Sequence, residues 1–118
     1  MNKASHDASV AAHIVASDGP ELDVAAFHCQ QAIEKMLKAF LVHHRVEFEK
    51  IHDLRRLLDL CAGVDATFDE LRDSVEPLTV YAVAYRYPGP ADPTADEVSD
   101  ACNIVQHVEK FISARLEQ

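Results

Sequence analysis

The chain has 118 residues, of which 48% are hydrophobic and 26% charged, as in ordinary globular domains. We therefore treat residues 1–118 as a single domain. Three glycines and five prolines are too few turn residues for the many short strands of an all-β fold, so an all-α fold is favoured. The formal net charge of −9 repels polyanions over most of the surface, so any nucleic-acid contact must be local.

No apolar run approaches the roughly 18 residues of a membrane span, and the N-terminus lacks the apolar core of a secretory signal. We therefore expect a cytoplasmic protein without a membrane segment. Cys29, Cys61 and Cys102 stand far apart with no Cys-x-x-Cys pair, which fits neither a disulfide framework nor a zinc knuckle. We interpret them as reduced cysteines that are mostly buried.

The first half of the chain predicts three helices. Residues 4–17 carry apolar side chains at helical spacing, and Gly19-Pro20 ends that stretch. Residues 20–44 form the most strongly periodic stretch. Asp53 can cap a short helix that Gly63 stops. The residues expected on the outer side of these helices are Gln30, Gln31, Glu34, Lys35 and Lys38, followed in the short helix by Arg55, Arg56 and Asp59.

The fourth predicted helix begins after Gly63. Thr67 with Glu70 forms a capping box that opens this helix, because the two side chains can bond each other's backbone N–H groups. Pro77 should kink the helix, since proline lacks an N–H group for the helical hydrogen bond. The turn residues 86–90 end it.

A second capping box, Thr94 with Glu97, opens the last helix, which keeps its apolar period to near Leu116. Four of the predicted helices are long enough to pack antiparallel through short connections. The predicted fold is therefore an up-and-down four-helix bundle with one additional short helix. Its predicted core comprises Ile14, Cys29, Ile33, Met36, Phe40, Leu57, Leu71, Leu78, Val105 and Ile112.

Seven histidines raise the question of a metal site. His52-Asp53 is similar to the pair of metal-dependent HD phosphohydrolases, and His43-His44 lies nearby in sequence. Adjacent histidines on a helix point about 100° apart, however, and no further ligands can be identified. We predict neither a metal nor another cofactor. A glycine-rich phosphate loop is also missing from the sequence.

Three places in the sequence suggest ligand binding. The outer side of the second helix carries Lys35 and Lys38. His52-Asp53 sits at a helix start, where its side chains can point into a cleft. Tyr85-Arg86-Tyr87-Pro88 places an arginine between aromatic rings, a grouping able to bind phosphate while stacking a base. Arg86 is equally suited to neutralising a helix C-terminus.

The segment Phe27-His28-Cys29-Gln30-Gln31-Ala32-Ile33-Glu34-Lys35-Met36-Leu37-Lys38-Ala39 resembles the F-H-x-Q-Q-A-x-E-K-x-L-K-A signature of the HEPN family. The order of the following elements matches as well, over about residues 5–117. The resemblance implies a helical bundle, commonly a homodimer, often encoded beside a minimal nucleotidyltransferase and associated with RNA or nucleotide binding.

Many HEPN proteins are ribonuclease toxins, which use an arginine followed after four to six residues by a histidine. No histidine follows Arg86 at that spacing. Arg45 and His52 have the nominal spacing but fall at a different helix junction. We therefore do not expect an enzyme, and we treat Arg86 and His52 as the only candidate catalytic residues.

Three functional hypotheses follow. The first is a dimeric HEPN module that binds nucleotide or RNA and works with a minimal nucleotidyltransferase, as in a toxin–antitoxin pair or a nucleotide-handling system. Its alternatives are a metal-independent ribonuclease toxin, with His52 as the base, and a structural dimer without a ligand. The predicted nucleotide or RNA contacts of the first hypothesis are Lys35, Lys38, His52, Asp53, Arg86 and Tyr87.

Overall fold

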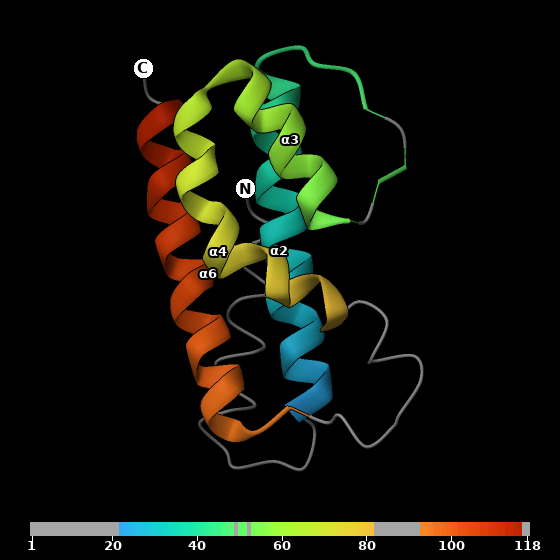
Figure 1. Cartoon of the computed structure of the whole chain (residues 1–118), viewed down its shortest axis with the longest axis vertical. Helices are drawn as coiled ribbons and strands as arrows, with labels where there is room; N and C mark the ends of the chain where they lie inside the picture. The colour runs from blue at the N-terminus through green and yellow to red at the C-terminus, as the bar shows by residue number, and fades with distance from the viewer. Residues whose placement is uncertain (1–21, 49, 52, 82–92, 117–118) are drawn as a thin grey trace.

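The computed structural model describes residues 22–48, 50–51, 53–81 and 93–116, and every regular element within these ranges is helical (Figure 1). The predicted all-α fold is therefore confirmed. Residues 4–17, the first predicted helix, lie outside the described residues. In chain order the elements are α2 (Leu22–His43), α3 (Leu54–Val64), the 3₁₀ helix η1 (Ala66–Leu71), α4 (Arg72–Val75), the 3₁₀ helix η2 (Glu76–Val80) and α6 (Ala95–Leu116).

α2 is enclosed by protein over most of its length. Every side chain of residues 24–41 is buried or half-buried. The prediction that Gln30 and Glu34 line an outer side is wrong, because Gln30 is 0% and Glu34 only 3% exposed. Gln30 accepts a hydrogen bond from Gln31 at 2.8 Å, as a buried amide requires. The polar residues of this helix are therefore part of the packed structure.

A left-handed turn ends α2. Arg45 has a φ of 58°, a conformation that usually favours glycine. Its N–H donates to the carbonyl of Val42 at 3.0 Å, and the N–H of Val46 donates to the carbonyl of Leu41 at 2.9 Å. This pair of bonds satisfies carbonyls that the helix end leaves unpaired. The chain then leaves the helix axis toward α3.

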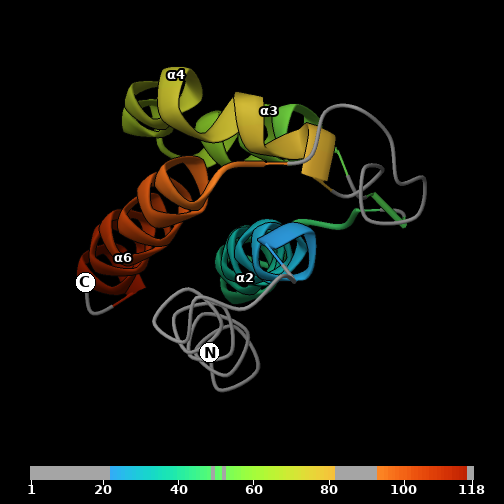
Figure 2. The same ribbon diagram turned by 90° about the horizontal axis from the view of Figure 1, so that it is seen from below.

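α2 and α6 lie side by side and run in the same direction (Figures 1 and 2). In their first halves, the sulfur atoms of Cys29 and Cys102 are 3.5 Å apart. Toward their C-terminal ends, the ring of Phe68 lies between Phe40 and Phe111, with ring centroids 4.5 and 5.1 Å away. Alternate members of an up-and-down order run parallel, so this pair agrees with the predicted topology.

α3 and residues 66–81 form a second layer over one side of the α2 and α6 pair (Figure 2). Asp53 caps α3 as predicted, since its carboxylate accepts the N–H of Arg55 at 2.9 Å. The helix passes the predicted stop at Gly63 and ends at Val64. Its inward face consists of Leu54, Leu57, Leu58 and Cys61.

Residues 66–81 do not form the one kinked helix that the sequence predicted. The stretch is divided into η1, α4 and η2, and Pro77 lies at the start of η2, where α4 has ended. The predicted capping box of Thr67 with Glu70 is also wrong. Asp65 is the cap of η1, because the N–H and hydroxyl groups of Thr67 donate to its carboxylate at 3.0 and 2.6 Å.

The capping box at the start of α6 is confirmed. The N–H of Glu97 donates to the hydroxyl of Thr94 at 3.1 Å, and the N–H of Thr94 donates to the carboxylate of Glu97 at 3.0 Å. None of the described helices has both the length and the apolar character needed to cross a membrane. Of the predicted core, Ile14 lies outside the described residues; the buried members, each at most 5% exposed, are Cys29, Ile33, Met36, Phe40, Leu57, Leu71, Leu78, Val105 and Ile112.

Candidate functional site

The structure describes half of the predicted site residues. His52, Arg86 and Tyr87 lie outside the described residues, so their positions relative to the rest of the site stay predictions. Lys35 and Lys38 lie on α2, and Asp53 precedes α3. The surroundings of these three side chains can therefore be compared with the predicted binding role.

Lys38 neutralises a buried carboxylate within α2. Its Nζ lies 3.3 Å from Oε1 of Glu34, and the side chains of Lys38 and Glu34 are 25% and 4% exposed. Lys35 is half-buried and also interacts within the protein. A buried carboxylate needs such a partner, because leaving it unpaired is strongly destabilising. The charge of Lys38 is therefore accounted for by its structural role beside Glu34.

Asp53 has a structural role of the same kind. Besides capping α3, its carboxylate lies 3.4 Å from the guanidinium of Arg55, in a pair whose side chains are 62% (Arg55) and 43% (Asp53) exposed. Exposed ion pairs contribute little stability, so the cap is the stronger of the two interactions. Because this ion pair is weak, the Arg55 side chain can move away from Asp53 at little cost in free energy.

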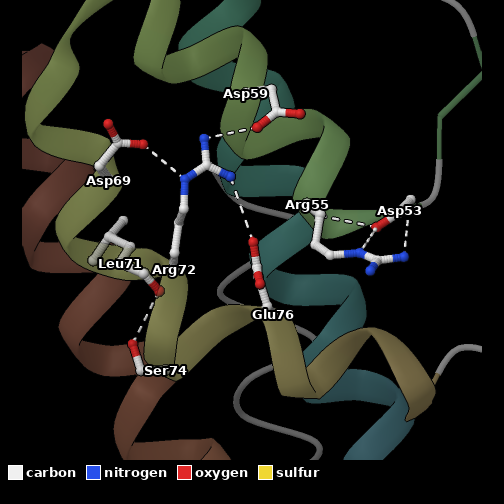
Figure 3. Close-up of polar contacts among 8 residues, drawn as sticks. All are labelled: Asp53, Arg55, Asp59, Asp69, Leu71, Arg72, Ser74 and Glu76. Atoms are coloured by element: carbon white, nitrogen blue, oxygen red, sulfur yellow. Dashed lines mark hydrogen bonds and ion pairs between the residues drawn. The ribbon is translucent and has the colours of Figure 1, made fainter.

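The guanidinium group of Arg72 is surrounded by three carboxylates (Figure 3). It lies 2.7 Å from Asp59, 2.7 Å from Asp69 and 3.4 Å from Glu76. The hydrogen bonds with Asp69 and Asp59 raise the pKa of Arg72 above its already high value. This arginine joins α3, η1 and η2, and its donor groups are occupied.

An open groove of about 580 Å³ lies beside this cluster. Two arginines and two acidic residues line it, and further carboxylates stand around Arg72. A phosphate would meet this negative charge without gaining the donors of Arg72. The groove is therefore poorly suited to an anionic ligand. Its lining residues are Arg55, Arg72, Asp73, Glu76, Pro77, Thr79 and Val80.

A smaller hollow, of about 340 Å³, lies between the loop after α2 and the first turns of α3. Phe48, Ile51 and Leu60 give it an apolar, half-buried floor. Arg56 is exposed at its edge, and within the described part of the chain Arg56 has no ion-pair partner; Glu47 is the acidic residue in the lining. An apolar surface beside an unpaired arginine can hold a flat ring and a phosphate together.

The sequence alone did not single out this hollow. Arg56 was correctly expected to face water, but Phe48 lies in the polar stretch 44–50 between helices and Ile51 follows that stretch, so neither was predicted to line a site. The available signal was the presence of two large apolar residues, Phe48 and Ile51, within four positions before His52. Among the described residues, no three His, Cys, Asp or Glu side chains gather as possible metal ligands.

Comparison with known families identifies the chain. The family model described as HEPN domain matches residues 1–117, which is nearly the entire sequence. The protein therefore belongs to the HEPN domain family, as the signature in α2 predicted. A search of curated proteins found no match, and neither did a search of solved structures.

Proposed function

We propose that this HEPN domain binds a nucleotide, or a short single-stranded segment of RNA, in the hollow between residues 47–51 and the start of α3. The observation that carries the proposal is the combination of an apolar floor with the exposed Arg56, which forms no ion pair with any residue that the structure describes. His52, a predicted ligand contact, stands between Ile51 and Asp53 in the sequence, next to the residues that line the hollow. A nucleotide matches these surroundings through its base and its phosphate.

Charge favours this hollow over the larger groove. The chain has a formal charge of −9, so a phosphate is attracted only to a cation that neighbouring carboxylates do not already neutralise. Arg72 in the larger groove is neutralised by three carboxylates, whereas Arg56 stands at the positive end of the α3 helix dipole. The volume of the hollow, about 340 Å³, also suits a nucleotide, because pockets that bind small molecules measure roughly 300 to 1,000 Å³.

The proposal includes a homodimer that works with a minimal nucleotidyltransferase. Membership of the HEPN family supports this part, since such proteins commonly dimerise and are often encoded beside such an enzyme. The predicted contacts Arg86 and Tyr87 then belong to the same ligand site or to the partner surface. The net charge favours a small ligand or short segment over a long bare RNA.

Binding can be tested with two neighbouring arginines. Arg56→Ala should lower affinity for mononucleotides or short RNA by roughly 1 to 3 kcal/mol, the scale of a charge-assisted contact. Arg55→Ala is the matched control, because Arg55 is an exposed arginine of the same helical turn but is paired with Asp53. Titration calorimetry with a panel of nucleotides and oligoribonucleotides measures the affinities of both variants. Equal affinities of wild type and Arg56→Ala would remove Arg56 from the site.

The remaining predicted residues need separate variants. His52→Ala and Arg86→Ala should weaken the same titration if these side chains reach the ligand. RNA cleavage by the wild type that disappears in either variant would instead support the ribonuclease hypothesis. Sedimentation analysis tests the dimer, and affinity purification followed by mass spectrometry tests the nucleotidyltransferase partner. A monomer at all concentrations would contradict the dimer.

A further inference from the structure

Two cysteine thiols meet at the contact between α2 and α6. The sulfur atoms of Cys29 and Cys102 are 3.5 Å apart, although 73 residues separate them in the sequence. Both cysteines are free. A disulfide bond has a sulfur–sulfur distance of about 2.05 Å, so bond formation requires a closure of about 1.5 Å. Side-chain rotations within two adjoining helices can supply a movement of that size.

The two thiols differ in exposure and in acidity. Cys29 is 0% exposed, whereas Cys102 is half-buried and therefore the one that a reagent reaches first. A hydrogen bond from Cys29 lowers the pKa of Cys102 to about 7, against the opposing effect of its burial. The same bond and its own burial raise the pKa of Cys29 far above that of an ordinary thiol. Near neutral pH, Cys102 therefore carries the larger thiolate fraction of the two and is the better nucleophile, while Cys29 stays protonated.

We propose that Cys29 and Cys102 form a reversible, peroxide-dependent disulfide that joins α2 to α6. The Cys102 thiolate first attacks one oxygen of hydrogen peroxide. The oxygen–oxygen bond breaks, hydroxide leaves and takes up a proton as water, and Cys102 becomes a sulfenic acid. The sulfur of Cys29 then attacks the sulfur of Cys102, the sulfur–oxygen bond breaks, and the leaving hydroxide takes the Cys29 proton as a second water. Two thiols are oxidised by two electrons, and one peroxide is reduced to two waters.

Cys61 provides an internal control. It is buried, its thiol donates to the carbonyl of Leu37 at 3.6 Å, and burial raises its pKa to about 12. A thiol of that pKa is almost entirely protonated near neutral pH and reacts slowly with peroxide. Oxidation should therefore spare Cys61 while it consumes Cys29 and Cys102.

The disulfide should also change the stability of the fold. Joining residues 73 positions apart restricts the unfolded chain, and on the chain-entropy view a loop of that length stabilises a small domain strongly. We expect a rise in Tm of roughly 10 °C on oxidation, reversed by a thiol reductant. Because residues 24–41 of α2 are buried or half-buried, the bond would join an enclosed helix to α6.

The experiment treats the full-length reduced protein with stoichiometric hydrogen peroxide and then blocks free thiols with an alkylating reagent in denaturant. We expect intact-mass spectrometry to show two hydrogens lost and one of the three thiols still free, and peptide mapping to show Cys29 joined to Cys102. Three free thiols after treatment, or a bond that includes Cys61, would overturn the proposal.

Variants separate the two chemical steps. Cys61→Ala should form the same disulfide at the rate of the wild type. Cys29→Ala should stop at the sulfenic acid of Cys102, which a dimedone probe captures, and Cys102→Ala should capture no probe. Circular dichroism checks that each variant is folded. If Cys29→Ala destabilises the protein, the wild-type peptide map still decides whether the disulfide forms.

Discussion

The guanidinium group of Arg115, in the last turn of α6, donates a hydrogen bond to the carboxylate of Asp65 at 3.2 Å. Asp65 stands at the corner where α3 ends and η1 begins. Arg115 also donates to the hydroxyl of Thr67 at 2.9 Å and lies over the ring of Phe111, 3.3 Å from its centroid. Because 50 residues separate Asp65 from Arg115, this contact joins the end of the chain to the second layer.

Arg115→Ala should therefore destabilise the fold. The side chain of Arg115 is only 21% exposed and takes part in charge-assisted bonds, so we expect a loss of about 1 to 2 kcal/mol. Urea denaturation followed by circular dichroism measures the loss. Lys110→Ala is the control, because Lys110 is an exposed residue of α6, and such changes usually stay within about 0.5 kcal/mol. Equal effects of the two variants would contradict the assigned role of Arg115.

Asp65 should make stability depend on pH in the acid range. The hydroxyl and N–H groups of Thr67, together with Arg115, hold the pKa of Asp65 below its usual value. This depressed pKa stabilises the folded state above the unfolded pKa of about 3.9, and the stabilisation is lost as the pH falls through the folded pKa. Asp65→Asn should thus destabilise the protein at pH 7. The difference in stability between this variant and the wild type should narrow below about pH 4. Thermal unfolding across that range measures the difference; a constant gap would contradict the pKa assignment.

Arg45→Gly should stabilise the protein. Arg45 has a φ of 58°, which strains a residue with a Cβ atom but not glycine. Removing the strain should gain about 1 kcal/mol, reduced by the greater freedom of glycine in the unfolded chain. Arg45→Ala keeps the Cβ and should show no such gain. Chemical denaturation of both variants separates the backbone effect from the loss of the arginine side chain.

Gly63→Ala should also stabilise the protein, here by adding a Cβ atom rather than removing one. Gly63 lies within α3, has no positive φ, and an added Cβ would meet no atom within 4 Å. Alanine has the higher helix propensity and less freedom in the unfolded state, so we expect a gain of roughly 0.4 to 1 kcal/mol. Gly63→Val serves as a comparison because its β-branched side chain has a lower helix propensity. A destabilised Gly63→Ala would mean that the end of α3 differs from this structure.

Two substitutions separate the cap role of Asp53 from its predicted ligand role. Asp53→Ala should cost roughly 0.5 to 2 kcal/mol in stability, because the N–H of Arg55 loses its acceptor. Asp53→Ser keeps a capping oxygen and should stay near wild type. Nucleotide affinity is measured on the same samples. A stable Asp53→Ser variant with reduced affinity would assign Asp53 to the ligand site as well.

Local sequence patterns predicted the helices and most of the core. The apolar period of α2 and α6 and the caps at Asp53 and Thr94 are confirmed, because each depends on residues within one or two helical turns. Residues 66–81 were predicted less well. Pro77 permits either a kinked helix or a change to 3₁₀ geometry, and the local sequence pattern does not distinguish between them.

The candidate sites depended on contacts between distant residues. By itself, the sequence determined the helical class, the caps at Asp53 and Thr94, the core stripes and the HEPN signature. Only the tertiary structure decided that Glu34 is buried, that Arg72 is neutralised by Asp59, and that Cys29 meets Cys102. The physical reason is the distance along the chain over which each effect acts. Helical periodicity and capping depend on residues a few positions apart. Burial and long-range pairing depend on how whole helices pack, which no short segment encodes.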